Sequence, residues 1–313
     1  MKLKFLLSLL ILTSSLNCFS SKITAHKGEV SDGYNFWLAE PDDISEKKPL
    51  IIFLHGASLC GNDLQKVKRY GTIDAIEKGR NIDAYVMAPQ NPGGSWNPTK
   101  IMNLVEWIES KHNIDTDRVY VLGMSLGGYG TMSFATAYPD KVAAAIAMCG
   151  GNTFKDSSPL NEVPLWIIHG TGDRDVAVSK SDQVVESMKA ANPETPRLVY
   201  DRIPGMNHSK PARVFYMPET YEWLFQHSLS DRNRPVAETF ELDESQWNSA
   251  YKNLDFSKSK SNSSSKSSKK NSSKAGSKKS KSKKSVFKKN TSKTKSSKSK
   301  TSSKKKSSTK KKK

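Results

Sequence analysis

The apolar residues of this chain fall into short continuous runs, each followed by glycine and polar residues. Residues 119–122 form one run, and residues 49–56 and 164–170 contain two more, while residues 197–200 are strand-like. Runs of this length bounded by turn residues are typical of strands covered on both faces of a parallel sheet. They therefore predict a sheet with a buried interior.

Helical spacing of apolar residues alternates with these strands. It is clearest in residues 101–111 and 181–190. Strands that alternate with helices indicate an α/β domain, with a mostly parallel sheet flanked by helices. We expect one such domain over residues 21–230, because this segment is long enough for a full core and contains no internal repeat.

A serine enclosed by glycines follows the strand-like run at residues 119–122. The sequence of residues 118–128 is RVYVLGMSLGG. Gly123 and Gly127 remove the side chains that would collide where a strand turns sharply into a helix, which gives the G-x-S-x-G nucleophile elbow. Ser125 is then the candidate nucleophile, and the N–H of Leu126 points to the same space. A glycine-rich turn without chemistry is the alternative for this pattern alone.

The other parts of a serine hydrolase site follow in the order Ser, Asp, His. Asp173 lies just beyond the run at residues 164–170, and His208 lies in a glycine-containing loop after residues 197–200. Upstream, the loop after His55-Gly56 can direct the Ala57 N–H to a developing oxyanion. Asp175 is an alternative to Asp173 as the acid.

These residue types supply a complete mechanism of ester cleavage. A serine hydroxyl needs a neighbouring imidazole to accept its proton, which is the role of His208. Asp173 would hold that ring in the correct tautomer, and the N–H groups of Ala57 and Leu126 would bind the oxyanion. This chemistry requires no metal and no organic cofactor.

The chain resembles the α/β-hydrolase superfamily over residues 32–228. Within it, the similarity is to compact esterases: feruloyl and acetyl-xylan esterases, phospholipase/carboxylesterases and predicted secreted peptidases. The most specific motifs are NIDTDRVY leading into GMSLGGYGTM, then ATAYPD, CGG and HGTGDRDV. The resemblance implies Ser125 as nucleophile, His208 as base and Asp173, four residues after His169, as acid. Ser58 stands where such esterases usually have glycine in the oxyanion loop.

Several aromatic, histidine and cysteine residues have a structural interpretation beside a functional one. Trp96 is the candidate substrate-binding residue, with packing over the sheet edge as the alternative. The remaining histidines show no metal-ligand spacing, and we interpret His55 and His169 as hydrogen-bonded hinge residues. Cys60 and Cys149 could pair, although a buried free Cys149 is the favoured state.

The first twenty residues have the composition of an export signal. A basic start, an apolar run over residues 5–16 and small residues near Ser20 predict a secretory signal peptide over residues 1–20, too short for a membrane span. Lipidation of Cys18 is the alternative. The expected location is therefore secreted, periplasmic or at the cell surface.

Charge divides the end of the chain from the rest. The formal net charge is +19, but residues 257–313 alone hold 24 lysines and no acid, so residues 1–256 are slightly acidic. This Lys/Ser tail cannot bury enough apolar surface to fold, so we predict disorder. Its expected partner is an anionic polymer or surface, with nucleic acid less favoured. Residues 231–256 form an acidic linker or packed extension.

Three classes of function remain open at this point. The first is a secreted serine hydrolase of short-chain or aromatic acyl esters, including acetyl or feruloyl esters of polysaccharide. The second is a phospholipase, lysophospholipase or peptidase with the same mechanism. The third is a surface-binding protein with a relic hydrolase domain, against which the intact Ser, Asp and His argue. A small-molecule or polysaccharide ester is therefore the expected substrate.

Overall fold

A computed structural model of the chain describes residues 21–236 and 242–257. The predicted signal peptide, residues 1–20, lies outside the described residues. So do residues 237–241 of the linker and residues 258–313 of the Lys/Ser tail.

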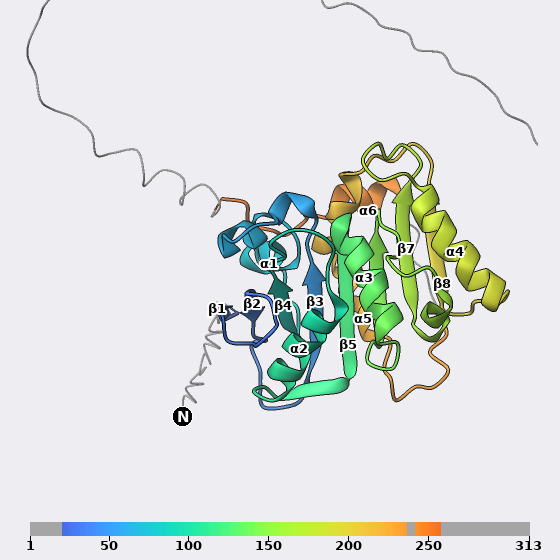
Figure 1. Cartoon of the computed structure of the whole chain (residues 1–313). Helices are drawn as coiled ribbons and strands as arrows, with labels where there is room; N and C mark the ends of the chain where they lie inside the picture. Colours follow the sequence, from blue (N-terminus) through green and yellow to red (C-terminus); the bar gives the residue numbers. More distant parts are fainter. Residues whose placement is uncertain (1–20, 237–241, 258–313) are drawn as a thin grey trace, which may run out of the picture. The chain divides into compact units, whose positions relative to one another are not determined.

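The described residues build one eight-stranded sheet flanked by helices (Figure 1). Its spatial order is β1-β2-β4-β3-β5-β6-β7-β8. Strands β1 and β2 are antiparallel, and β3 to β8 run parallel. The strands are β1 Ile23–His26, β2 Phe36–Ala39, β3 Lys48–Leu54, β4 Tyr85–Pro89, β5 Ile114–Met124, β6 Ala144–Met148, β7 Leu165–Gly170 and β8 Leu198–Ile203.

The central strands are buried on both faces, as their continuous apolar runs predicted. Alternate residues of β3 enter two separate cores, so that Ile51 and Phe53 face one layer and Ile52 and Leu54 face the other. The parallel register aligns the ends of β5 and β6, where Met124 pairs with Met148. The loops that leave these strands therefore meet at one edge of the sheet.

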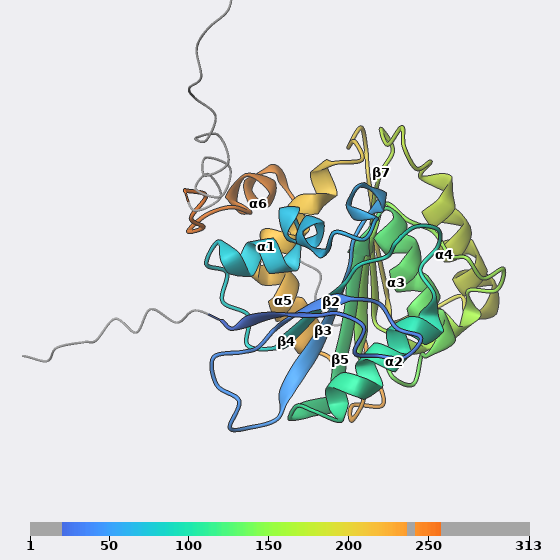
Figure 2. The same ribbon diagram turned by 60° about the vertical axis from the view of Figure 1, so that its left-hand side comes forward.

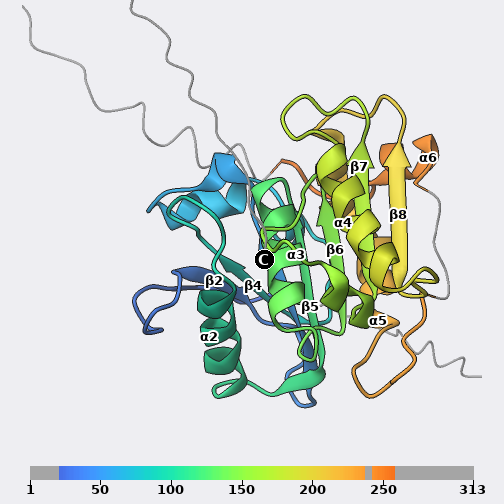
Figure 3. The same cartoon turned by 45° about the vertical axis from the view of Figure 1, so that its right-hand side comes forward.

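Helices cover both faces of the sheet (Figures 2 and 3). One core contains residues of α2, α3 and α4, and the other contains residues of α1, α5 and α6. The helices are α1 Thr72–Glu77, α2 Pro98–Glu109, α3 Leu126–Ala137, α4 Ser179–Ala191, α5 Pro218–Phe225 and α6 Glu244–Ser249. Four 3₁₀ helices join them: η1 Ala57–Leu59, η2 Leu64–Arg69, η3 Ser158–Glu162 and η4 Lys210–Tyr216.

The two helices that the sequence predicted are present as α2 and α4. Helix α2 starts earlier than its apolar periodicity because the Asn97 side chain accepts hydrogen bonds from the N–H groups of Thr99 and Lys100, with Pro98 in the first turn.

Between α3 and β7 the chain holds only β6, η3 and short connections. As expected, no lid is inserted between Ser125 and Asp173, a segment that lies wholly within the described residues.

Residues 242–257, which we call the C-terminal extension, contain α6 and pack on the domain. Asp243 and Gln246 form a capping box at the start of α6, and Trp247 is buried. Within the described ranges, no helix combines the length and the apolar character needed to cross a membrane.

Candidate active site

Ser125 lies in a sharp turn between β5 and α3. Its backbone has φ 60° and ψ −121°, which few residues other than glycine adopt. A Cβ on Gly127 would overlap the Leu54 carbonyl, and a Cβ on Gly123 would lie 2.6 Å from the same oxygen. The two glycines thus allow β5, α3 and the end of β3 to meet, and the strained turn has the geometry of a nucleophile elbow.

The loop after β3 lies directly beside this turn. A Cβ built on Gly56 would be 3.5 Å from Ser125 Cβ, so the first residues of η1 and α3 flank the serine. Ala57 and Leu126 are these first residues, and N–H groups at this position have no acceptor within their own helix. The two predicted oxyanion donors therefore lie next to the candidate nucleophile.

Tyr70 holds the loop after β3 in place through a hydrogen bond to Gly56. Its hydroxyl accepts a hydrogen bond from the Gly56 N–H at 3.0 Å. Ser58 itself is exposed, although it stands where the resembling esterases usually have glycine. The larger residue is accommodated because this position of the loop is open to solvent.

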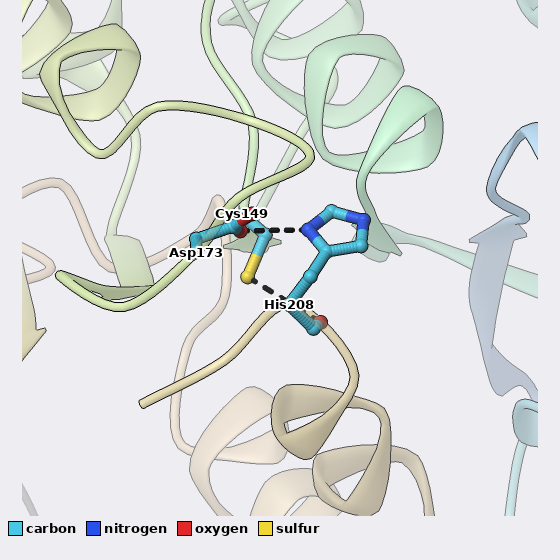
Figure 4. Close-up of side chains that lie close together, drawn as sticks. All are labelled: Cys149, Asp173 and His208. Carbon is cyan, nitrogen blue, oxygen red and sulfur yellow. Dashed lines mark hydrogen bonds and ion pairs between the residues drawn. The ribbon is translucent and has the colours of Figure 1, made fainter. Parts of the chain in front are cut away.

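Asp173 and His208 form a direct pair (Figure 4). His208 Nδ1 lies 2.6 Å from Asp173 Oδ2. Burial raises the pKa of Asp173, but hydrogen bonds from the Val176 N–H, His208 and the Asp175 N–H outweigh it, so its pKa is lowered. An ionised carboxylate only accepts, so Nδ1 carries the proton and Nε2 has the free lone pair that a base needs.

The loops that carry these two residues are joined by backbone contacts. The Gly172 N–H donates to the Met206 carbonyl at 3.1 Å, and the Gly205 N–H donates to Thr171 Oγ1 at 2.9 Å. A Cβ on Gly172 would lie 2.5 Å from the Gly205 carbonyl oxygen. The absence of a side chain at this position allows the acid loop and the base loop to lie against each other.

The alternative acid, Asp175, lies on the surface. Its N–H donates to Asp173 Oδ1, while the carboxylate that faces His208 belongs to Asp173. No hydrogen bond joins the Ser125 hydroxyl to His208 within the described part of the chain. Such contacts are often long before substrate binds, so this geometry is compatible with a triad.

Two buried histidines support the site, as their structural interpretation predicted. His55 Nδ1 donates to the Gly56 carbonyl at 2.8 Å, and Nε2 accepts from the Asn91 N–H at 3.0 Å. Burial lowers the pKa of His55 to about 4. His169 Nε2 donates to the Val176 carbonyl at 3.0 Å and lies 3.3 Å from Asp173 Oδ2. The contact of His169 with the acid was not predicted, although its spacing of four residues from Asp173 was the available signal.

Cys149 is a second neighbour of the pair that the sequence did not assign to the site. Its Sγ lies 3.9 Å from the His208 carbonyl, and burial raises the pKa of the thiol. Cys149 and Cys60 are both free. Ligand atoms of Cys149, Asp173 and His208 all lie within 4.8 Å of one another. The three side chains are therefore close enough to bind one soft metal ion together after a small movement.

Trp96 lies in the core rather than on an open surface. Its indole Nε1 donates to the His55 carbonyl at 3.3 Å, and its ring packs edge to face on His55 and Tyr34. Only 3% of the residue is exposed. These contacts agree with the alternative that Trp96 packs rather than binds substrate. They support the end of β3, which leads to Gly56.

Comparison with known proteins agrees with this architecture. A thermostable esterase of known structure superposes with a TM-score of 0.57 at 24% identity, covering 67% of this chain and 63% of that one. The mostly parallel sheet, flanking helices and serine elbow define an α/β-hydrolase, so the predicted fold class is confirmed. The family described as "Putative esterase" matches residues 69–236, more than half of the chain, and the protein belongs to this family.

Two relatives are named for activities on polymers. A bifunctional acetylxylan esterase/xylanase of Neocallimastix patriciarum is 28% identical over 159 residues, covering 48% of this chain and 23% of that protein. Poly(3-hydroxyalkanoate) depolymerase C of Paucimonas lemoignei is 24% identical over 272 residues, covering 70% of this chain and 64% of that protein. The chain thus spans less than two thirds of the length of either relative.

Proposed function

We propose that this protein is a secreted serine hydrolase that cleaves carboxylic esters through Ser125, His208 and Asp173. The observation that carries the proposal is the 2.6 Å pair of Asp173 and His208 at the sheet edge that also presents the strained Ser125 turn. Membership of the esterase family supports ester bonds as the target.

The reaction would proceed in two steps. Ser125 Oγ attacks the ester carbonyl carbon while His208 Nε2 takes the hydroxyl proton, and the Ala57 and Leu126 N–H groups bind the resulting oxyanion. The bond to the alcohol breaks, and His208 gives its proton to the leaving alkoxide. Water then attacks the acyl-enzyme, loses a proton to His208 and releases the acid, which restores Ser125.

The proposed substrates are short-chain or aromatic acyl esters, including acetyl or feruloyl esters of polysaccharide. The absence of an inserted lid and the acetylxylan esterase among the relatives support this substrate class. The signal-like residues 1–20 support action outside the cytoplasm. A phospholipase, lysophospholipase or peptidase of the same mechanism is the alternative.

A substrate panel with matched variants tests the proposal. Wild-type protein should hydrolyse nitrophenyl acetate. It should also hydrolyse acetylated xylan or methyl ferulate faster than lysophospholipid, a peptide amide or poly(3-hydroxybutyrate). Ser125→Ala and His208→Ala should each abolish turnover and keep the fold, because neither removes core volume. Full activity of Ser125→Ala would refute the nucleophile, and a preference for lysophospholipid or peptide would favour the alternative. Inactive wild-type protein would favour a relic domain.

We also propose that the Lys/Ser tail, residues 257–313, holds the enzyme on a negatively charged polymer or surface. Phe287 is its one aromatic residue and it contains no arginine, so binding should be unspecific and reversed by salt. Deletion of residues 257–313 should release the protein from cells or acidic polysaccharide at low salt and leave nitrophenyl acetate turnover unchanged. Retention that survives both the deletion and high salt would contradict this role.

A further inference from the structure

The C-terminal extension, residues 242–257, covers the helix that follows the candidate base. This segment lies beyond the region that matches the esterase family, residues 69–236. We propose that the extension positions the loop of His208 and thereby controls turnover without touching substrate. The inference rests on the proposed role of His208.

One face of η4 provides the contact surface. Lys210, Arg213 and Tyr216 are spaced by three residues, and a 3₁₀ helix has three residues per turn, so these side chains lie on the same face. All three contact the extension. The opposite side of η4 is anchored in the core through Val214 and Phe215, which are fully buried.

The contacts on this face combine charge, hydrogen bonding and ring packing. Lys210 Nζ lies 2.6 Å from Glu244 Oε1 and 5.4 Å from the Trp247 ring centroid. Arg213 Nη1 donates to the Trp247 carbonyl at 2.6 Å, and its guanidinium lies 5.4 Å from the Tyr251 ring. The rings of Tyr216 and Tyr251 pack edge to face at 4.9 Å.

A second set of bonds ties the extension to the end of α1. Arg80 Nη2 donates to the Tyr216 carbonyl at 2.5 Å and to the Ala250 carbonyl at 3.4 Å. The Asp255 N–H donates to the Lys78 carbonyl at 2.8 Å. The extension therefore bonds both to η4 and to the residues that follow α1.

His208 is two residues from the start of η4. Asn207 Oδ1 accepts hydrogen bonds from the N–H groups of Ser209 and Lys210, so the turn that holds His208 is continuous with the first turn of η4. Hydrogen bonds of 3₁₀ helices have poorer geometry than those of α-helices, so η4 depends on packing against its two faces. A misplacement of the base by about 1 Å can lower turnover about 100-fold.

Trp247→Ala in the full chain tests the inference, because it removes the ring that fills this interface. We expect kcat on nitrophenyl acetate to fall about 10-fold with KM within about 2-fold, since base position and not substrate binding is changed. Amide hydrogen exchange should rise in residues 209–216. Trp247→Phe should restore most of kcat. Trp107→Ala is the control and should leave kcat unchanged, because Trp107 lies on α2 and packs, partly buried, against the opposite core.

A milder variant covers the case in which Trp247→Ala does not fold. Arg213→Gln should lower kcat in the same direction, by about 3-fold, because it weakens the bond to the Trp247 carbonyl. Wild-type kcat in variants whose residues 209–216 exchange rapidly would overturn the inference. Ser125→Ala in the same assay separates failure of this inference from failure of the proposed function. If Ser125→Ala is inactive, wild-type kcat in the rapidly exchanging variants refutes only the role of the extension. If Ser125→Ala is active, the proposed function itself fails.

Discussion

Lowering the pH from 7 to 5 should destabilise this protein through its buried histidines. His55 is fully buried, and its Nε2 accepts a hydrogen bond from the Asn91 N–H. Protonation of Nε2 would replace this bond with two donors facing each other, so the folded protein keeps the ring neutral. Its pKa falls from 6.5 to about 4, whereas the unfolded chain protonates near the ordinary value.

The size of the effect follows from this difference. Between pH 6.5 and pH 4 the unfolded state binds the proton and the folded state does not, so the free energy of unfolding decreases as the pH falls. The shift corresponds to about 3 kcal/mol in total, of which about 2 kcal/mol is lost between pH 7 and pH 5. His227, whose pKa burial also lowers to about 4, adds a similar amount.

Urea unfolding followed by tryptophan fluorescence at pH 7, 6 and 5 measures this dependence. His55→Gln cannot be protonated, so its loss between pH 7 and pH 5 should be smaller than that of wild type by about 2 kcal/mol. His227→Gln should remove a second, similar share, and the double variant should remove both. If His55→Gln loses as much free energy of unfolding as wild type over this range, the reasoning from its buried neutral state is wrong.

Two further predictions concern the neighbours of His208. Asp173→Asn should lower kcat on nitrophenyl acetate by about 10⁴-fold because it favours the wrong tautomer of His208, while Asp175→Asn should stay within a few-fold; the reverse ranking would show that the acid is misassigned. Micromolar Cd²⁺ should inhibit by drawing together the ligand atoms of Cys149, Asp173 and His208. Inhibition should weaken at least about 10-fold in Cys149→Ala and stay in Cys60→Ala, and equal sensitivity of wild type and Cys149→Ala would exclude this site.

The sheet and the order of the site residues could be predicted because they depend on local signals. Apolar runs mark buried strands, and glycine on either side of Ser125 marks the turn. Parallel strands end at one edge, which brings Asp173 near His208 although 35 positions separate them. These inferences need only residue type and spacing.

Contacts between distant segments with no periodic signal could not be predicted. In the sequence, Lys210 and Arg213 look like ordinary solvent-exposed residues. Only the structure shows that the extension packs over them. Trp96 was ambiguous because a loop tryptophan can face either a pocket or the core, and the direction depends on the conformation of residues 91–97. The nearness of Cys149 to His208 depends on how two loops fold against each other.

The close approach of α3 to the sheet limits how this enzyme could be altered by evolution or design. A Cβ on Gly150 would lie 2.6 Å from the Gly128 carbonyl carbon, and a Cβ on Gly127 would overlap the end of β3. A side chain at either glycine would force the backbone of α3 or of its neighbour to move, so we expect substitution at these positions to displace the serine. New acyl preferences would then have to arise away from these glycines, so libraries that spare Gly127 and Gly150 should retain the most active clones.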